Sequence, residues 1–295
     1  MRLYFSDPRG FDPMLLHQEN IRAIFRKLSR QMSKLAGKPA AENVHKFRTS
    51  SRRVEVLVED LAKKRSRNDK KLLKVLGRLR KTAGRVRDLD AQTAALRSLK
   101  IPQEPVRKSQ LMRTLAEERG KREEKLVKAL DKKTVAEVRK RLKRTAGDLE
   151  IAKSADPKSL ALQKVAALEL DHSAVTEKTL HRFRIAGKRA RYIAELAGKD
   201  AEAVRLVAQL KHLQDVIGDW HDWAQLAQAA EKLFGGVQDS ALVAALGNVT
   251  RAKFRQAVHT LIETQSALTV KKPVAVTPLG HRPSRQNSQA AAAVA

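Results

Sequence analysis

The sequence predicts an all-α protein made of two related halves, and three observations support this fold class. Apolar residues recur at helical spacing through most of the chain, strand-like alternation is scarce, and one basic signature occurs twice. The chain has 295 residues, a length typical of about two domains. Hydrophobic residues make up 42% of it, which is enough to build a buried core.

Five helices are expected in the first half, each separated from the next by Gly, Pro or a polar break. The second helix has the clearest pattern, because its apolar face repeats at spacings of three and four residues. That face consists of Val44, Phe47, Ser51, Val54, Val58 and Leu61. The expected helices cover about 13–35, 44–61, 69–99, 106–129 and 134–151.

A break at Asp156 and Pro157 separates the second half from the first, and Pro157 fits the first turn of a new helix. We expect four further helices, at about 159–171, 179–197, 201–234 and 240–268. Three prolines and a polar, alanine-rich end predict a disordered tail. The expected organisation is therefore a first helical half at 10–155, a second at 156–268 and a tail at 271–295.

The internal repeat is the most informative feature of the sequence. The segment 44–54 recurs at 180–190, 136 residues later, with an apolar residue, His, a base, Phe, Arg and a paired base in place. The segment 84–89 recurs at 218–223, 134 residues later. Two motifs in the same order at nearly the same offset indicate two copies of one helical unit.

The first motif predicts an anion site, because positions i, i+3 and i+7 lie on one helix face. His45, Arg48 and Arg52 share such a stripe in the first copy, as do His181, Arg184 and Lys188 in the second. Each stripe borders an apolar face, where clustered cations repel one another and lose hydration. An anion between the copies would compensate this cost, since Arg offers phosphate-like oxygens a planar donor fork and Lys a point charge.

The overall charge also points to a polyanionic partner. Lys and Arg number 61 and Asp and Glu 32, so the formal net charge is +29. Nucleic acid, an anionic membrane surface and inorganic polyanions all fit this charge, although an aromatic content of 4% disfavours single-strand binding by base stacking.

Several classes are excluded or disfavoured. The absence of Cys excludes disulfides and cysteine-based zinc sites. No apolar run approaches the roughly 18 residues that a membrane helix needs, and the first residues lack the apolar core of a signal peptide. We expect a cytoplasmic protein without membrane insertion.

The paired motifs resemble those of the CHAD domain, the conserved-histidine α-helical domain, over about residues 10–268. The resemblance implies two four-helix bundles related by a pseudo-twofold axis, with a basic cleft that binds inorganic polyphosphate, and in some members an association with polyphosphate granules. Its His-x-x-Arg-x-x-x-base-base pattern corresponds to His45, Arg48, Arg52 and Arg53, and to His181, Arg184, Lys188 and Arg189. Its Leu…Gly-x-x-x-Asp element corresponds to Leu79, Gly84 and Asp88, and to Leu213, Gly218 and Asp222.

The resemblance implies that these eight basic residues bind polyphosphate, together with four bases on the helices that follow: Arg78, Lys81, Arg85 and Lys211. The copies differ where Asp215 and Asp219 replace the equivalents of Lys81 and Arg85, which predicts a cleft less symmetric in charge than in fold. The Glu-x-Glu-x-Lys signature of the triphosphate tunnel enzymes that often accompany this domain is missing, so a stand-alone CHAD protein is expected.

Three functions remain open at this point: a polyphosphate-binding module that acts on granules or as a scaffold, a protein that binds nucleic acid non-specifically, and an enzyme that handles phosphate compounds. No phosphate-binding Gly-rich loop, zinc-protease motif or nucleophile motif is found. We therefore expect a binding module without catalytic residues, metal or cofactor. Asp88 and Asp222 are expected to hold nearby Arg or His side chains, Gly84 and Gly218 to permit close packing or a kink, and Trp220 and Trp223 to be buried.

Overall fold

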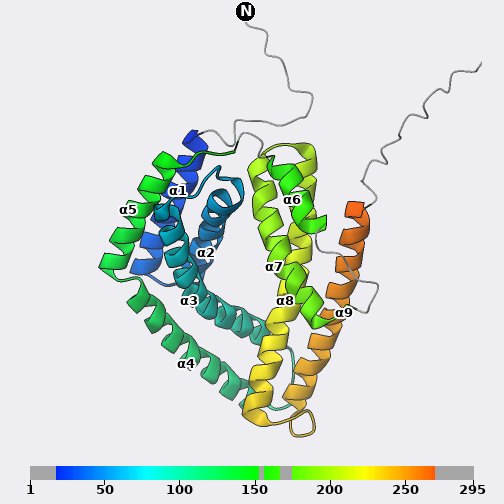
Figure 1. The fold of residues 1–295 in the computed structure, drawn as a ribbon. Helices are drawn as coiled ribbons and strands as arrows, with labels where there is room; N and C mark the ends of the chain where they lie inside the picture. The colour runs from blue at the N-terminus through cyan, green and yellow to red at the C-terminus, as the bar shows by residue number, and fades with distance from the viewer. Residues whose placement is uncertain (1–17, 153–155, 167–174, 270–295) are drawn as a thin grey trace, which may run out of the picture.

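The computed structural model describes residues 18–152, 156–166 and 175–269, which form two groups of helices (Figure 1). Part of the expected first and sixth helices and the expected tail at 271–295 lie outside the described residues. The first group contains α1 (Gln18–Gly37), α2 (Ala41–Val56), α3 (Arg67–Ser98), α4 (Pro105–Ala129) and α5 (Lys132–Asp148). The second contains α6 (Pro157–Ala166), α7 (Glu177–Ala194), α8 (Ala201–Phe234) and α9 (Ala241–Thr269).

The all-α prediction is confirmed. Within the described residues, the β-structure is limited to an isolated antiparallel bridge between Ala62 and Ile151. None of the described helices combines the length and the apolarity needed to cross a lipid bilayer.

The helix boundaries reproduce the sequence repeat. α2 begins at Ala41 and α7 at Glu177, which is the offset of 136 residues found for the first motif. α3 begins at Arg67 and α8 at Ala201, which is the offset of 134 found for the second. Each motif therefore occupies the same position on the same helix of its half.

The apolar face predicted for α2 is buried along its whole length. Its six residues, from Val44 to Leu61, are at most 1% exposed. The helix ends in a π-helical turn, Leu57–Leu61, which places Glu59 and Asp60 next to α7 of the other half. Such turns are rare and often occur at functional sites.

Polar caps fix where the two cleft-forming helices of the second motif begin. At α3, the Ser66 hydroxyl accepts the Asp69 N–H and the Asp69 carboxylate accepts the Ser66 N–H, a reciprocal capping box. At α8, the Asp200 carboxylate accepts the N–H of Ala203. These caps set the register of the side chains that follow.

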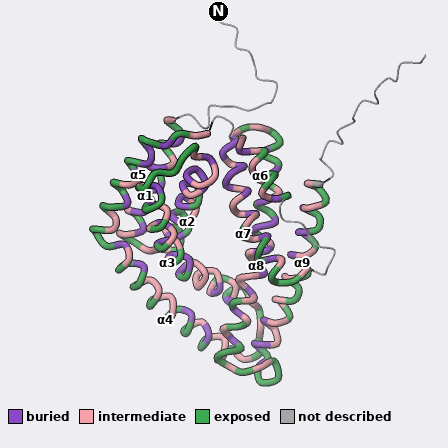
Figure 2. Tube along the Cα trace, viewed as in Figure 1, coloured by how far each residue is buried: buried purple, intermediate pink, exposed green. Residues whose placement is uncertain are grey.

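The two halves meet where α2 contacts α7 and α3 contacts α8. The core of the first group continues into α7 and α8 through residues such as Ile193 and Leu210. A second cluster joins the ends of α3 and α4 to α8 and α9, and a third fills the space between α7, α8 and α9. Trp223 and Trp220 belong to these two clusters and are 7% and 3% exposed, so both are buried as expected. Figure 2 shows that buried residues recur along the helices of both groups.

Candidate anion-binding cleft

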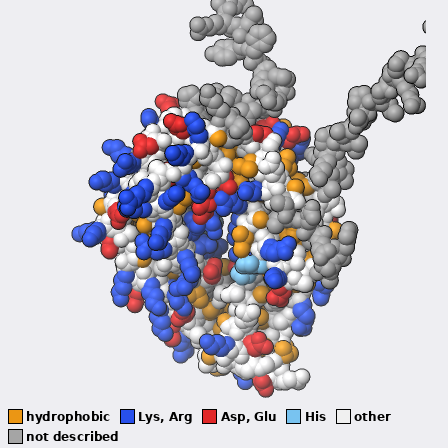
Figure 3. All heavy atoms as spheres, viewed as in Figure 1, with side chains coloured by type: hydrophobic (Ala, Val, Ile, Leu, Met, Phe, Trp, Pro, Cys, Tyr) orange, Lys and Arg blue, Asp and Glu red, His pale blue; other side chains and the backbone are white. Residues whose placement is uncertain are grey.

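A cleft of about 530 Å³ lies between α2, α3, α7 and α8, the four helices that carry the repeated motifs. The space-filling view shows this hollow near the middle of the molecule, with Lys and Arg side chains along it (Figure 3). Its basic lining residues are His45, Arg48 and Arg52 from α2, Arg80 and Arg87 from α3, and Arg184, Lys188, Arg189 and Arg191 from α7. Its acidic ones are Glu55, Asp88, Asp215, Asp219 and Asp222.

Four of the lining cations have no carboxylate partner within 4 Å among the described residues: Arg48, Arg87, Arg184 and Lys188. Nη1 of Arg48 donates a hydrogen bond of 3.1 Å to the backbone carbonyl of Arg80. Nε of Arg184 is buried and has no hydrogen-bond partner in the described structure. A buried N–H donor without an acceptor is costly, so this atom marks a place where an anionic oxygen would be stabilised.

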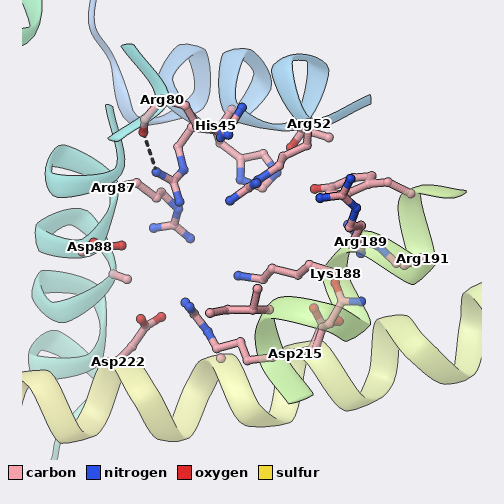
Figure 4. A pocket seen from close by; sticks show the side chains of 18 of the residues that line it. His45, Arg52, Arg80, Arg87, Asp88, Lys188, Arg189, Arg191, Asp215 and Asp222 are labelled. Atoms are coloured by element: carbon pink, nitrogen blue, oxygen red, sulfur yellow. Dashed lines mark hydrogen bonds between the residues drawn. The ribbon is translucent and has the colours of Figure 1, made fainter. Parts of the chain in front are cut away.

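Lys188 is the most perturbed of these cations. Its side chain reaches from α7 into the cleft (Figure 4). Burial, together with the charges of Arg184, Arg48 and Arg52, lowers its pKa to about 7. Asp222 opposes this lowering of the pKa only weakly. With a pKa of about 7, Lys188 is close to half protonated at neutral pH.

His45 titrates under the same influences. Partial burial lowers its pKa, and the positive charges of Arg87, Arg48 and Arg191 act in the same direction. The neutral imidazole is therefore favoured in the free protein. Burial also lowers the pKa of Arg48, which Asp88 partly offsets.

The acidic side chains of the second motif are not ligands of nearby cations. Within the described residues, neither Asp88 nor Asp222 makes an ion pair or a hydrogen bond to Arg or His, so the expectation that they hold such side chains by contact is not met. Burial raises the pKa of Asp222 to about 6, with Asp88 adding to the shift and Arg184 opposing it. The two carboxylates influence the cleft through charge alone.

Other lining cations are neutralised by carboxylates. Glu55 accepts a hydrogen bond of 2.7 Å from Arg52 and a further one from Arg80. Nε of Arg191 lies 3.5 Å from the Glu195 carboxylate. These pairs reduce the charge that Arg52, Arg80 and Arg191 present to the cleft.

Two ion pairs across the halves are related by the repeat. Arg53 of α2 binds Glu195 at the end of α7 at 2.9 Å, and Arg189 of α7 binds Glu59 at the end of α2 at 2.9 Å. Arg189 also binds Asp60 at 2.8 Å. Because Arg53 corresponds to Arg189 and Glu59 to Glu195 at an offset of 136, the pairs are reciprocal, as a pseudo-twofold relation between the halves requires.

The structure brings six of the twelve expected residues into the cleft: His45, Arg48, Arg52, Arg184, Lys188 and Arg189. His181 lies outside the lining and is exposed, with its ring 6.1 Å from that of His221. Arg53 also lies outside the lining and forms an ion pair with Glu195. The remaining four are exposed and outside the lining: Arg78, Lys81, Arg85 and Lys211.

Sequence reasoning missed Arg80, Arg87 and Arg191. Gly84 carried a usable signal for the first two, because residues four before and three after it share its helix face. The expected charge asymmetry is present, since Asp215 and Asp219 line the cleft whereas Lys81 and Arg85 do not. Lys211 and Lys253 bind these carboxylates at 2.7 and 2.8 Å.

Comparison with known proteins identifies the family. The CHAD domain model matches residues 19–231. No match is found among curated proteins. Two solved structures are similar in fold, each with a TM-score of 0.59. PptA from Streptomyces chartreusis is 16% identical, and the match covers 85% of this chain and 96% of PptA. The CHAD domain from the plant Ricinus communis is 18% identical, and the match covers 88% of this chain and 91% of that domain.

Proposed function

We propose that this chain, which belongs to the CHAD domain family, binds inorganic polyphosphate in the cleft between its two halves. The observation that carries the proposal is the convergence of Arg48, Arg87, Arg184 and Lys188 on one cleft without carboxylate partners among the described residues. Bringing such cations together costs free energy in the absence of an anion. A chain of phosphate groups would offset this cost with charge-assisted hydrogen bonds.

The dimensions of the cleft favour a slender inorganic polyanion over nucleic acid. Its volume of about 530 Å³ lies within the range of small-molecule sites, roughly 300–1,000 Å³. The aromatic ring in its lining belongs to Tyr192, which is 7% exposed and already lies 4.8 Å from the Arg191 guanidinium. Among the described residues of the lining, the His45 imidazole is then the ring left for a base to stack on, and no free Trp, Phe or Tyr ring accompanies it.

The decisive measurement is a competition titration of long-chain polyphosphate against duplex DNA and RNA at fixed salt. We expect polyphosphate to displace both nucleic acids from the wild-type protein. Displacement of polyphosphate by DNA or RNA would favour the alternative function, non-specific binding of nucleic acid.

A variant pair on α7 locates the site. Arg184→Gln removes a cleft cation, whereas Arg182→Gln removes an exposed cation two residues away, outside the lining. We expect Arg184→Gln to weaken polyphosphate binding about tenfold or more, which corresponds to a lost charge-assisted hydrogen bond of about 1.5–3 kcal/mol. Equal losses in both variants would contradict binding in the cleft.

We propose binding without catalysis. The shifted pKa values of Lys188 and Asp222 follow from burial and neighbouring charge, and a bound polyanion would restore the charged form of Lys188. Incubation with polyphosphate is expected to release no phosphate and leave the chain-length distribution unchanged. Turnover that disappears in Lys188→Arg or Asp222→Asn would reveal an enzyme.

For the cellular role, we propose a cytoplasmic protein that associates with polyphosphate granules or acts there as a scaffold. The affinity of the protein for long polyphosphate chains would bring it to the granules. A fluorescent fusion is expected to colocalise with granules and to become diffuse in the Arg184→Gln variant, whereas Arg182→Gln should leave the colocalisation unchanged.

A further inference from the structure

A regular row of six bases lies on the exposed face of α3, outside the cleft: Arg67, Lys71, Lys74, Arg78, Lys81 and Arg85. We call it the α3 stripe. Successive members are four, three, four, three and four residues apart, so they follow one side of the helix. All six are exposed, and within the described residues none forms an ion pair.

The stripe is separate from the cleft but runs beside it on the same helix. α3 presents Arg80 and Arg87 to the cleft, and the centre of the stripe is turned roughly 150° around the helix axis from them. From Arg67 to Arg85 it extends about 27 Å along the helix, with a charge about every 5 Å.

The second half has no counterpart, although its helix is otherwise equivalent. At the offset of 134, the six positions of α8 are Ala201, Arg205, Ala208, His212, Asp215 and Asp219. The imbalance extends to the halves: residues 18–152 contain 39 Lys and Arg against 17 Asp and Glu, whereas residues 156–269 contain 15 against 13. In Figure 3 the basic side chains likewise crowd the part of the face formed by the first group of helices. The excess charge of the protein is thus concentrated on the half that carries the stripe.

We propose that the α3 stripe is an external track for polyphosphate, which holds the part of a long chain that extends beyond the cleft. This inference rests on the proposed function of the cleft and adds a preference for long chains over short ones. The track binds through the charge of successive phosphates, and its bases are free to engage them because no carboxylate in the described part of the chain pairs with them.

The surroundings of the stripe favour a linear polyanion over a protein partner. Protein interfaces depend on a few apolar or aromatic anchors, and none of the large exposed hydrophobic residues found in the described structure lies on α3. A straight row of evenly spaced cations instead matches an extended chain with one charge on each unit.

The test compares two fourfold variants against two ligands. The stripe variant is Lys74→Gln/Arg78→Gln/Lys81→Gln/Arg85→Gln. Its matched control is Lys121→Gln/Lys125→Gln/Lys128→Gln/Lys132→Gln, which removes the same charge and the same spacing from exposed positions of the same half. Isothermal titration at moderate salt measures the affinity of each variant for tripolyphosphate and for long-chain polyphosphate.

We expect the stripe variant to lose about tenfold or more in affinity for long chains, with a shallower salt dependence, while its affinity for tripolyphosphate stays within about twofold of wild type. The control should lose far less. Equal losses in the two variants would show a general effect of net charge and overturn the track.

Two further outcomes separate this inference from the proposed function. Loss of long-chain binding in the stripe variant but not in Arg184→Gln would leave the track standing and overturn the cleft. Preferential displacement of polyphosphate from the stripe by RNA or DNA, measured in the Arg184→Gln background, would overturn the choice of polyphosphate as its occupant.

Discussion

The guanidinium group of Arg48 lies against the α-carbon of Gly84, where a side chain would not fit. A Cβ on residue 84 would collide with Nη1 of Arg48 and lie 3.3 Å from its Cζ. The same Nη1 donates to the carbonyl oxygen of Arg80, one turn earlier on α3. The Arg of the first motif and the Gly of the second are thus in direct contact, which gives a physical reason for their occurrence together in this chain.

Replacing Gly84 with Ala should displace Arg48 without unfolding the protein. The collision involves the end of a flexible side chain, and Ala favours a helix interior over Gly by about 0.5–1 kcal/mol. We expect unchanged or slightly higher thermal stability and polyphosphate affinity about tenfold lower, because a charge-assisted hydrogen-bond donor is moved. Thermal unfolding and calorimetric titration measure the two effects.

Gly77→Ala is the matched control for this substitution. Gly77 lies on the same helix outside the cleft, and a Cβ there meets no atom within 4 Å. It should stabilise α3 without affecting affinity. If Gly84→Ala binds polyphosphate as the wild type does, the position of Arg48 is irrelevant to binding.

The helices and the repeat were predictable from the sequence, whereas the face that α3 turns to the cleft was not. The spacing of leucine and alanine residues identifies the buried face of α3, because no second apolar stripe competes with it. Leu72 and Leu76 lie on this face and are buried. Bases, by contrast, occur around most of the exposed circumference of α3, so their periodicity selects the solvent-facing stripe as readily as the cleft. Gly84 lies on the same face as Arg80 and Arg87, and its tertiary contact with Arg48 identifies this face as the one turned to the cleft.

Lys188→Arg should remove a pH dependence of polyphosphate binding. The pKa of Lys188 is about 7 in the free protein, and a bound polyanion raises it, so binding takes up a proton. Wild-type affinity should therefore fall as pH rises above about 7, by up to tenfold per pH unit for one proton. Arg stays protonated over this range, so the variant should show a flatter profile. Parallel profiles for the two proteins would show that Lys188 does not contact the ligand.

Lys188→Met should stabilise the free protein. The unfolded chain holds the Lys188 proton up to a pKa near 10.5, whereas the folded protein releases it near 7. Between these values the unfolded state binds more protons, so the contribution of Lys188 to the free energy of unfolding increases with pH and is least favourable below about 7. We expect the Met variant to gain about 1–3 kcal/mol at pH 6 and progressively less towards pH 10. Urea denaturation at several pH values measures this gain, and a gain that is constant with pH would assign it to packing instead.

The arginines of the two reciprocal ion pairs should differ in their contribution to stability, because Arg189 binds the buried Asp60 in addition to Glu59. Arg189 binds Asp60, whose side chain is 5% exposed, whereas Arg53 binds Glu195, which is 20% exposed. Arg189→Gln leaves the buried Asp60 with Lys164, at 3.9 Å, as its one cationic partner among the described residues, and should cost about 1–3 kcal/mol. Arg53→Gln leaves Glu195 near Arg191 and should cost about 1 kcal/mol or less. Denaturant unfolding measures the loss in the free energy of unfolding for each variant. An equal loss in both, or a larger loss in Arg53→Gln, would refute the argument from burial.

The histidines of the two motifs should behave differently, although their sequence positions are equivalent. His45 lines the cleft, and its pKa is lowered by partial burial and by Arg87, Arg48 and Arg191. A bound polyanion reverses this balance and favours the imidazolium form, so affinity should rise as pH falls through the histidine range, from about 7 to 5.5. His181 lies outside the lining and should contribute little.

The measurement is best made in the Lys188→Arg background, where the lysine no longer adds to the pH dependence. His45→Gln should flatten the remaining rise in affinity at low pH, whereas His181→Gln should retain it. Both variants meet the same ligand, so protonation of polyphosphate itself cancels in the comparison. A slope that survives His45→Gln but is lost in His181→Gln would place the ligand beside His181 and His221, outside the lining of the cleft.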